Sequence, residues 1–337
     1  MLFSLLASAL LLPASFAAPS RPLASDPLPV IIWHGLGDRF DNDGLADVAD
    51  IIREVHPGTY VHIIGLASDG SSDQRASFFG NVTAQSDQVC ASLSADPLLA
   101  ASRGRVDALG FSQGGLFLRG LVQRCPGIAV RSLVTFGSPH NGIAALPACR
   151  PWDLLCKGAE GALQGNKWSD WVQGNVVPAQ YYREVDEVTG LGGEEYLNRS
   201  GWLADLNNER DVKNGEYRAR LANLENFVMY LFEEDTTVLP KETSWFADVN
   251  LTSGEVTPLK DRLLYTNDWL GLRTLDERGG LMYRTVEKAK HMQLSEALLR
   301  QAFGDFFGHE NRKTALPKTA VSGESKWQHA LFAGGDW

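Results

Sequence analysis

Short apolar runs alternate with longer amphipathic stretches over most of this chain. Five runs have the length and the β-branched or aromatic content of buried strands, at residues 29–33, 106–109, 132–136, 227–232 and 280–286. Helical patterns cover residues 115–122 and 294–307. Because strands that alternate with helices form parallel sheets covered by those helices, the pattern predicts one α/β domain.

The turn between the run at 106–109 and the helix at 115–122 has the sequence G-F-S-Q-G, residues 110–114. In a strand-turn-helix elbow of this kind, side chains at the flanking glycine positions would collide with the neighbouring strand and helix. The serine hydroxyl then projects where a base can reach it. Ser112 is therefore a candidate nucleophile.

The first apolar run leads directly into His34-Gly35-Leu36-Gly37-Asp38. A turn of this type after an early strand supplies one backbone N–H of an oxyanion hole in serine hydrolases. Leu36 is the candidate for this donor, and Gln113, directly after the nucleophile, is the candidate for the other. Without the Ser112 elbow, an ordinary turn at a strand end would be the preferred interpretation of His34-Gly35.

Two histidines follow predicted strands, His140 after 132–136 and His291 after 280–286. In the chain order of these hydrolases the acid follows the serine and the histidine comes last. His291 is thus the candidate base, because neutral imidazole can accept the Ser112 proton and return it to the leaving group. His140 is interpreted as a structural or rim residue.

The acid that orients the base should follow a strand between Ser112 and His291. Glu233, Glu234 and Asp235 directly follow the run at 227–232. A carboxylate here could hold the histidine tautomer and stabilise the imidazolium. Spacing alone does not choose among the three.

Several separate motifs, most of them without an obvious chemical role, give the chain a more specific signature. They lie at residues 32–38, 110–119, 123–126, 206–210, 244–246 and 291–296. From about residue 28 to 307 the chain resembles the palmitoyl-protein thioesterases of the lysosomal type. One departure is the stretch 137–142, G-S-P-H-N-G, which is more typical of a general lipase.

The resemblance implies an α/β-hydrolase fold, a mostly parallel sheet flanked by helices, with a catalytic triad of Ser112, Asp235 and His291. It selects Asp235 over its neighbours because Val238 and Pro240 follow it. It implies hydrolysis of long-chain acyl (palmitoyl) thioesters of S-acylated proteins through an acyl-enzyme, with no cofactor. The alternatives are a general lipase or carboxylesterase with the same triad, and a non-catalytic lipid-binding protein.

Residues 141–223 separate the strand after the elbow from the strand that precedes the acid, and are expected to form a helical cap insertion. This segment is rich in aromatic and aliphatic residues: Trp152, Trp168, Trp171, Tyr181, Tyr182, Trp202, Leu154, Leu155, Val176 and Val177. They could line an apolar groove for an acyl chain or form a satellite core. The resemblance to an enzyme for long acyl chains favours the groove.

The ends of the chain differ from its centre. Residues 1–18 have an apolar segment and small residues typical of a cleaved signal peptide, although no basic residue precedes the apolar segment. A non-cleaved anchor is the alternative interpretation. Residues 308–337 are polar and are expected to be a poorly ordered tail. The protein is therefore expected in the secretory pathway, in the lysosome or vacuole or outside the cell, without a transmembrane segment in the mature chain.

The chain has four cysteines, Cys90, Cys125, Cys149 and Cys156, and an oxidising compartment favours disulfides. Three pairings are possible. Proximity favours Cys149 with Cys156, which leaves Cys90 with Cys125, and the family resemblance implies the same pairing. No Cys and His spacing predicts a metal site.

Three N-glycosylation sequons, at Asn81, Asn198 and Asn250, support the secretory interpretation. With 31 basic and 41 acidic residues the formal charge is −10, and no basic cluster stands out. Nucleic-acid binding is therefore not expected. A single domain and a monomer are expected.

Overall fold

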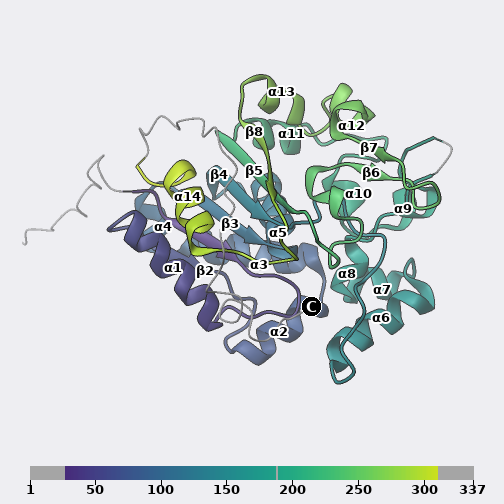
Figure 1. Ribbon diagram of the computed structural model, residues 1–337, viewed down its shortest axis with the longest axis horizontal. Helices are drawn as coiled ribbons and strands as arrows, with labels where there is room; N and C mark the ends of the chain where they lie inside the picture. The colour runs from purple at the N-terminus through teal and green to yellow at the C-terminus, as the bar shows by residue number, and fades with distance from the viewer. Residues whose placement is uncertain (1–26, 187–188, 310–337) are drawn as a thin grey trace, which may run out of the picture.

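The computed structural model describes residues 27–186 and 189–309 (Figure 1). The expected signal peptide (1–18) and residues 310–337 of the expected tail (308–337) lie outside the described residues. The first two residues of that tail are held in the structure, because Gly308 O accepts the Leu28 N–H at 3.0 Å and His309 forms a bridge with Pro27. The centre of the molecule is a six-stranded sheet in which all pairings are parallel, in the order β2-β1-β3-β4-β5-β8. Its strands are β1 (Val30–Trp33), β2 (Val61–Ile63), β3 (Arg105–Phe111), β4 (Ala129–Phe136), β5 (Asn226–Phe232) and β8 (Leu281–Val286).

The parallel α/β class expected from the alternating pattern is confirmed, and five of these strands coincide with the predicted apolar runs. The edge strand β2 was not predicted. It has three residues, and its centre is the half-buried His62. A run this short with a polar centre gives no periodicity to detect.

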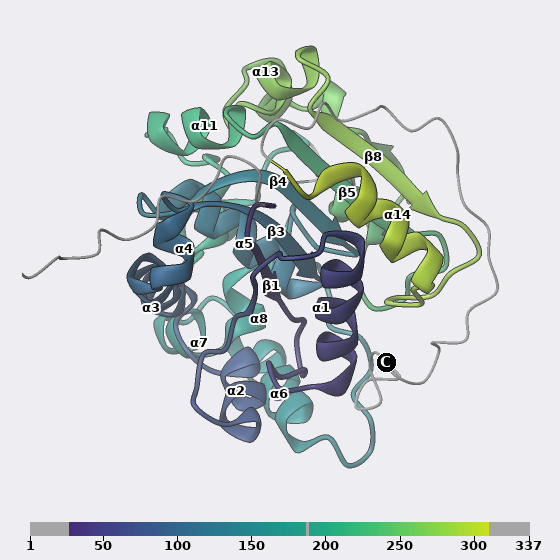
Figure 2. The ribbon, with the colours of Figure 1, turned by 90° about the vertical axis from the view of Figure 1, so that its left-hand side faces the viewer.

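Helices cover both faces of the sheet. Alternate residues of β1 belong to different cores: Val30 and Ile32 pack in one cluster, Ile31 and Trp33 in the other. Helices α1 (Asp43–Val55) and α14 (Glu296–Phe306) lie side by side over the first face (Figure 2). The second face is covered by α3 (Val82–Ala95), α5 (Gln113–Arg124) and α11 (Gly215–Ala222), with α4 (Pro97–Ala101) following α3.

The segment between β4 and β5, where the cap insertion is expected, is helical. It contains α6 (Leu154–Asn166), α7 (Asp170–Asn175), α8 (Val177–Gln180), α9 (Glu194–Arg199), α10 (Leu203–Leu206) and α11. Side-chain caps explain where several of these helices begin: Asp153 accepts the Cys156 N–H, and Ser169 accepts the Val172 N–H. In Figure 1, α6 to α10 lie to one side of the sheet, whereas α11 packs on α5.

A second excursion, which the sequence did not predict, separates β5 from β8. It contains η1 (Lys241–Trp245), the antiparallel pair β6 (Asp248–Val249) and β7 (Val256–Thr257), η2 (Leu259–Asp261), α12 (Leu263–Thr266) and α13 (Leu272–Glu277). Its elements are too short for a periodic signal. A buried ionic cluster, defined by Arg183, Glu209, Asp248 and Arg262, joins this excursion to the β4–β5 segment.

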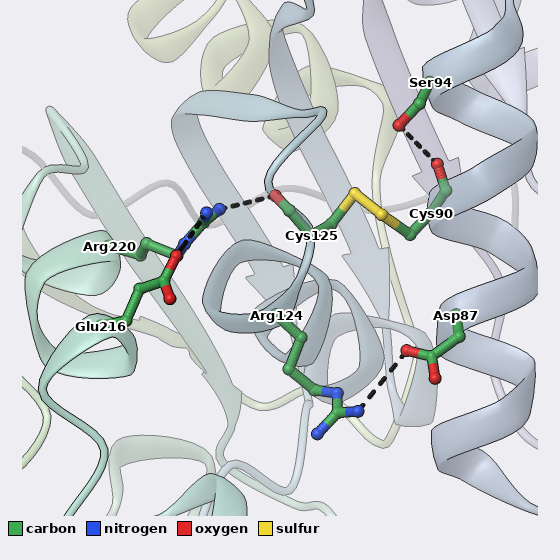
Figure 3. The surroundings of a disulfide bond; sticks show 7 residues. All are labelled: Asp87, Cys90, Ser94, Arg124, Cys125, Glu216 and Arg220. Atoms are coloured by element: carbon green, nitrogen blue, oxygen red, sulfur yellow. Dashed lines mark hydrogen bonds and ion pairs between the residues drawn. A yellow bond between two sulfur atoms is a disulfide. The ribbon is translucent and has the colours of Figure 1, made fainter.

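Two disulfides are present, between Cys90 and Cys125 and between Cys149 and Cys156, the pairs that proximity favours. The first ties α3 to the end of α5 (Figure 3). The second closes a short loop onto the first turn of α6.

The three sequon asparagines have different surroundings. Asn81 and Asn198 are exposed, whereas Asn250 is half-buried and its side-chain oxygen accepts two backbone N–H groups. Within residues 27–186 and 189–309, no helix is long and apolar enough to cross a bilayer.

Candidate active site

Ser112 lies in the turn between β3 and α5 with φ 50° and ψ −126°, a conformation that non-glycine residues rarely adopt. Gly110 and Gly114 must be glycines, because other backbone atoms lie too close to them to leave room for a side chain. A Cβ atom at Gly110 would lie 2.2 Å from the Cα atom of Gly115, and one at Gly114 would lie 2.3 Å from the carbonyl oxygens of Trp33 and His34. The sequence G-F-S-Q-G therefore folds into the strand-turn-helix elbow that it predicts.

His291 connects the serine to a carboxylate. Its Nε2 lies 3.0 Å from Ser112 Oγ, and its Nδ1 lies 2.7 Å from Asp235 Oδ2. The other oxygen of Asp235 accepts the N–H groups of Thr237 and Val238, at 2.8 and 3.0 Å. Both side chains are buried, with His291 6% and Asp235 1% exposed. Residues up to 179 positions apart thus meet because β3, β5 and β8 are parallel and their carboxyl ends lie at one edge of the sheet.

The two neighbouring acids do not take part in this contact. Glu233 and Glu234 are exposed, and the Glu233 carboxylate accepts the N–H of Lys288 at 2.7 Å. Only the third acid turns inward, because its Oδ1 is bound to the backbone of the turn that follows β5. Of the three adjacent acids, the structure thus brings Asp235 into contact with His291.

His140 is an internal structural residue and not part of a rim. Its ring is completely buried, lies 3.0 Å from Thr135 Oγ1 and stacks on Phe246. Burial, and secondly the charge of Arg119, lower its pKa well below the ordinary value for histidine. The ring is therefore neutral and enclosed.

The two candidate oxyanion donors flank Ser112. A Cβ atom at Gly35 would lie 3.1 Å from Ser112 Cβ, which brings the Gly35-Leu36 backbone against the nucleophile. Gln113 is the first residue of α5, where N–H groups have no partner within the helix. Its side chain is engaged elsewhere, since it donates to Ser77 O at 3.1 Å and accepts from the Tyr181 hydroxyl at 2.8 Å.

Sequence reasoning missed a buried acid behind His34. Asp73, on α2 (Gly70–Phe78), is fully buried, and its Oδ2 lies 2.8 Å from His34 Nε2. Burial alone lowers the pKa of His34, but the hydrogen bond and the charge of Asp73 outweigh it, so the net shift is upward. The sequence carries no signal for this pair, because α2 is mostly polar and the partners are 39 positions apart.

A pocket of about 570 Å³ opens beside Ser112 and His291. Its lining includes apolar side chains: Phe78, Phe111, Pro139, Ile143, Leu146, Pro147, Tyr181, Val238 and Met292. It also includes polar side chains: Asp38, Arg39, Asn42, Asp43, Gln74 and Thr237. The pocket thus brings both apolar and hydrophilic side chains beside Ser112 and His291.

The pocket corrects the expected role of the aromatic residues in segment 141–223. Of the ten aromatic and aliphatic residues named for this segment, only Tyr181 lines the pocket, and Trp152 and Trp171 are 77% and 64% exposed. Trp202 is buried instead, edge-on against Phe117 of α5 with ring centroids 5.4 Å apart. Large aromatic rings bury much surface when they pack between helices. The buried residues of this set other than Tyr181 therefore pack against other elements and do not line the pocket.

Comparison with known proteins agrees with this geometry. The family model "Palmitoyl protein thioesterase" matches residues 29–291. Palmitoyl-protein thioesterase 1 of Caenorhabditis elegans is 34% identical over 280 residues, which cover 82% of this chain and 90% of that protein. Lysosomal thioesterase PPT2 of Homo sapiens is 28% identical over 274 residues, covering 80% of this chain and 84% of that protein.

A further relative is a fusion protein. The palmitoyl-protein thioesterase-dolichyl pyrophosphate phosphatase fusion 1 of Schizosaccharomyces pombe is 36% identical over 305 residues. The match covers 88% of this chain but 46% of the fusion, so the chain spans about half the length of that relative. With a family model matched from β1 to His291 and a relative of similar length at 34% identity, the chain belongs to the palmitoyl protein thioesterase family and is a thioester hydrolase.

Proposed function

We propose that this thioesterase removes long-chain fatty acyl groups from cysteines of S-acylated proteins. Ser112 is the nucleophile, His291 the base and Asp235 the acid that orients it. The observation that carries the proposal is the pair of hydrogen bonds linking these three side chains beside a pocket lined in part by apolar side chains. The names of the relatives supply the substrate class.

The first half of the reaction acylates the enzyme. With its Nδ1–H donated to Asp235, His291 keeps the lone pair of Nε2 for the Ser112 hydroxyl proton. Ser112 Oγ attacks the thioester carbonyl, and the N–H groups of Leu36 and Gln113 stabilise the oxyanion. The C–S bond then breaks, and the imidazolium returns its proton to the departing cysteine sulfur.

The second half releases the fatty acid. His291 takes a proton from water, the resulting hydroxide attacks the acyl-enzyme carbonyl, and Ser112 leaves with a proton returned by His291. These steps use three side chains, the backbone N–H groups of Leu36 and Gln113, and one water molecule. In this arrangement the apolar side chains of the pocket receive the acyl chain and its polar side chains face the peptide that leaves.

A lipase or carboxylesterase would use the same three residues and is the second candidate. The motif at 137–142, which is typical of a lipase, favours it. In this structure that motif directly follows β4, and one of its residues, Pro139, lines the pocket. Substrate comparison separates the two functions.

The decisive experiment measures kcat/KM for acyl chains of increasing length, below the critical micelle concentration, on matched thioesters and oxygen esters. Each buried methylene stabilises by up to about 0.8 kcal/mol, so kcat/KM should rise by orders of magnitude from short to long chains. Thioesters should exceed oxygen esters, because a thiolate with a pKa near 8.5 leaves more readily than an alkoxide. Ser112→Ala is the control. Preference for short chains, or for oxygen esters at every length, would favour the general esterase.

We further propose that the protein is a monomer of the lysosome, the vacuole or the extracellular space. The two disulfides and the lysosomal name of the human relative support a place on the secretory route. Glycans at Asn81, Asn198 and Asn250 are expected on that route. A mobility shift on glycosidase treatment of the expressed protein tests this, and an unchanged mobility would contradict the glycan assignment.

A further inference from the structure

The loop after β1, residues 34–40, is held along its length by helix α2, and we call it the oxyanion loop. The N–H of Gly37 donates to Ser77 Oγ at 2.8 Å. The carbonyl of the same residue accepts from Gln74 Nε2 at 2.6 Å. Both polar groups of the Gly37 backbone are therefore bound to side chains of one helix.

Asp73, one residue before Gln74, holds the two ends of the loop. Its Oδ2 accepts the N–H of Phe40 at 2.7 Å and lies 2.8 Å from His34 Nε2. Its Oδ1 accepts the N–H of Leu66, in the segment after β2, at 2.7 Å. A carboxylate that is 0% exposed thus connects three separate segments, and the ring of His34 that it binds is 1% exposed.

Gly35 and Leu36 are the two residues between the attachment points at His34 and Gly37, and Leu36 is the candidate oxyanion donor. It lies between His34 and Gly37, both of which are bound to α2, and Gly35 contacts Ser112 closely. The same helix also contacts the second candidate donor, because the carbonyl of Ser77 accepts from the Gln113 side chain at 3.1 Å. One helix therefore contacts both sides of the nucleophile.

We propose that Asp73 is a positioning residue for thioester hydrolysis, which together with His34 fixes the oxyanion loop so that the Leu36 N–H is aligned before substrate binds. The inference rests on the proposed function, in which Leu36 and Gln113 stabilise the oxyanion. Preorganised donors act mainly on the charge that develops in the transition state. Loss of Asp73 should therefore lower kcat more than it raises KM.

The test uses Asp73→Asn in the full chain, because asparagine keeps the volume and removes the charge that binds His34. Since removal of a whole oxyanion donor lowers kcat by about 10²–10³-fold, misalignment should lower kcat by about 10–100-fold, with KM within about 3-fold. Binding of a long-chain alkylboronic acid, which forms a tetrahedral adduct with the serine, should weaken in parallel. Binding of palmitate should stay unchanged.

A second variant, Ser77→Ala, removes the partner of the Gly37 N–H. It should also lower kcat, by a smaller factor than Asp73→Asn.

Asp107→Asn is the matched control. Asp107 is an equally buried aspartate, bound to Arg131 at 2.6 and 2.9 Å near the start of β3, on no wall of the pocket. This variant should lose thermal stability and keep kcat and the boronate affinity of the wild type.

Two outcomes would overturn the inference. In the first, Asp73→Asn loses stability like Asp107→Asn while its kcat and boronate affinity equal those of the wild type. In the second, Asp73→Asn changes only KM. Either result leaves the proposed function intact, since the wild type still hydrolyses its esters. If the wild type hydrolysed neither thioesters nor oxygen esters, both the proposed function and this inference would fail.

Discussion

Ser112 has a backbone conformation that costs about 1 to 3 kcal/mol for a residue with a side chain, and such strain persists only where the surroundings impose it. Here the neighbouring backbone lies so close to Gly110 and Gly114 that a side chain at either position would clash. The strain points Oγ at His291, whose other nitrogen is bound to Asp235. Ser112 is thus bound to His291, and His291 is bound to Asp235.

Because the three side chains act as one unit, Ser112→Ala and His291→Ala should each lower kcat by several orders of magnitude, and the double variant should be little worse than either. Asp235→Asn should be severe but milder. Steady-state kinetics on a long-chain thioester measure all four variants. Glu234→Gln, on an exposed neighbour, is the control and should keep wild-type kcat. Full activity of Asp235→Asn together with loss in Glu234→Gln would reverse the assignment of the acid.

Helices α3 and α5 flank the elbow in the chain, and a covalent bond joins them. Cys90 lies in α3 and Cys125 caps the end of α5, where its carbonyl also accepts from Arg220 of α11 at 2.6 Å (Figure 3). Figure 3 also places Arg124 of α5 next to Asp87 of α3. The disulfide thus reinforces the contact of α3 with the end of α5, where α11 also packs.

The two disulfides should contribute differently. They close loops of 35 and 7 residues, which corresponds to about 4 and about 2.5 kcal/mol on the chain-entropy model. The double variant Cys90→Ser/Cys125→Ser should therefore lose more stability in denaturant unfolding than Cys149→Ser/Cys156→Ser. Since Cys156 lines the pocket, only the second variant should change KM. Equal losses of stability would contradict the loop-length argument.

At the scale of the whole molecule, two segments outside the sheet are joined by the ionic cluster of Arg183, Glu209, Asp248 and Arg262. Burial alone would raise the pKa of Glu209, but the charges and hydrogen bonds of Arg183 and the charge of Arg262 lower it to about 2. A carboxylate with a lowered pKa in the folded state stabilises the protein above its ordinary pKa. That contribution is complete above about pH 4.5 and is lost as the pH falls toward 2.

Glu209→Gln should lower the free energy of unfolding at pH 7 by about 3 to 5 kcal/mol, because it leaves two buried arginines short of a partner. The difference from wild type should shrink as the pH falls from 4.5 toward 2. Urea unfolding at a series of pH values measures it. Glu216→Gln, which removes an exposed partner of Arg220, is the control and should change stability by less than about 1 kcal/mol. A difference that stays constant down to pH 2.5 would contradict the role of Glu209.

The sequence by itself determined the parts of the protein that local rules govern. Five of the six sheet strands and the elbow around Ser112 follow from apolar periodicity and turn residues. Chain order then indicated His291 as the proposed base, and the resemblance to the family selected Asp235 among three adjacent acids. The strands and the elbow are visible because each lies within about ten consecutive residues.

The tertiary structure decided the features that join distant segments. The attachment of Asp73 to His34, the ionic cluster around Glu209 and the burial of Trp202 against Phe117 connect residues 14 to 85 positions apart. Burial of a polar side chain, and the face that an aromatic ring presents, depend on which elements pack together. The local hydrophobic pattern predicts neither of these features. Helix α2 is mostly polar, and the elements between β5 and β8 are too short to show a periodic pattern. The groove lining was wrongly predicted for the same reason: aromatic content does not say whether a ring is buried, as in Trp202, or exposed, as in Trp152, and only packing decides this.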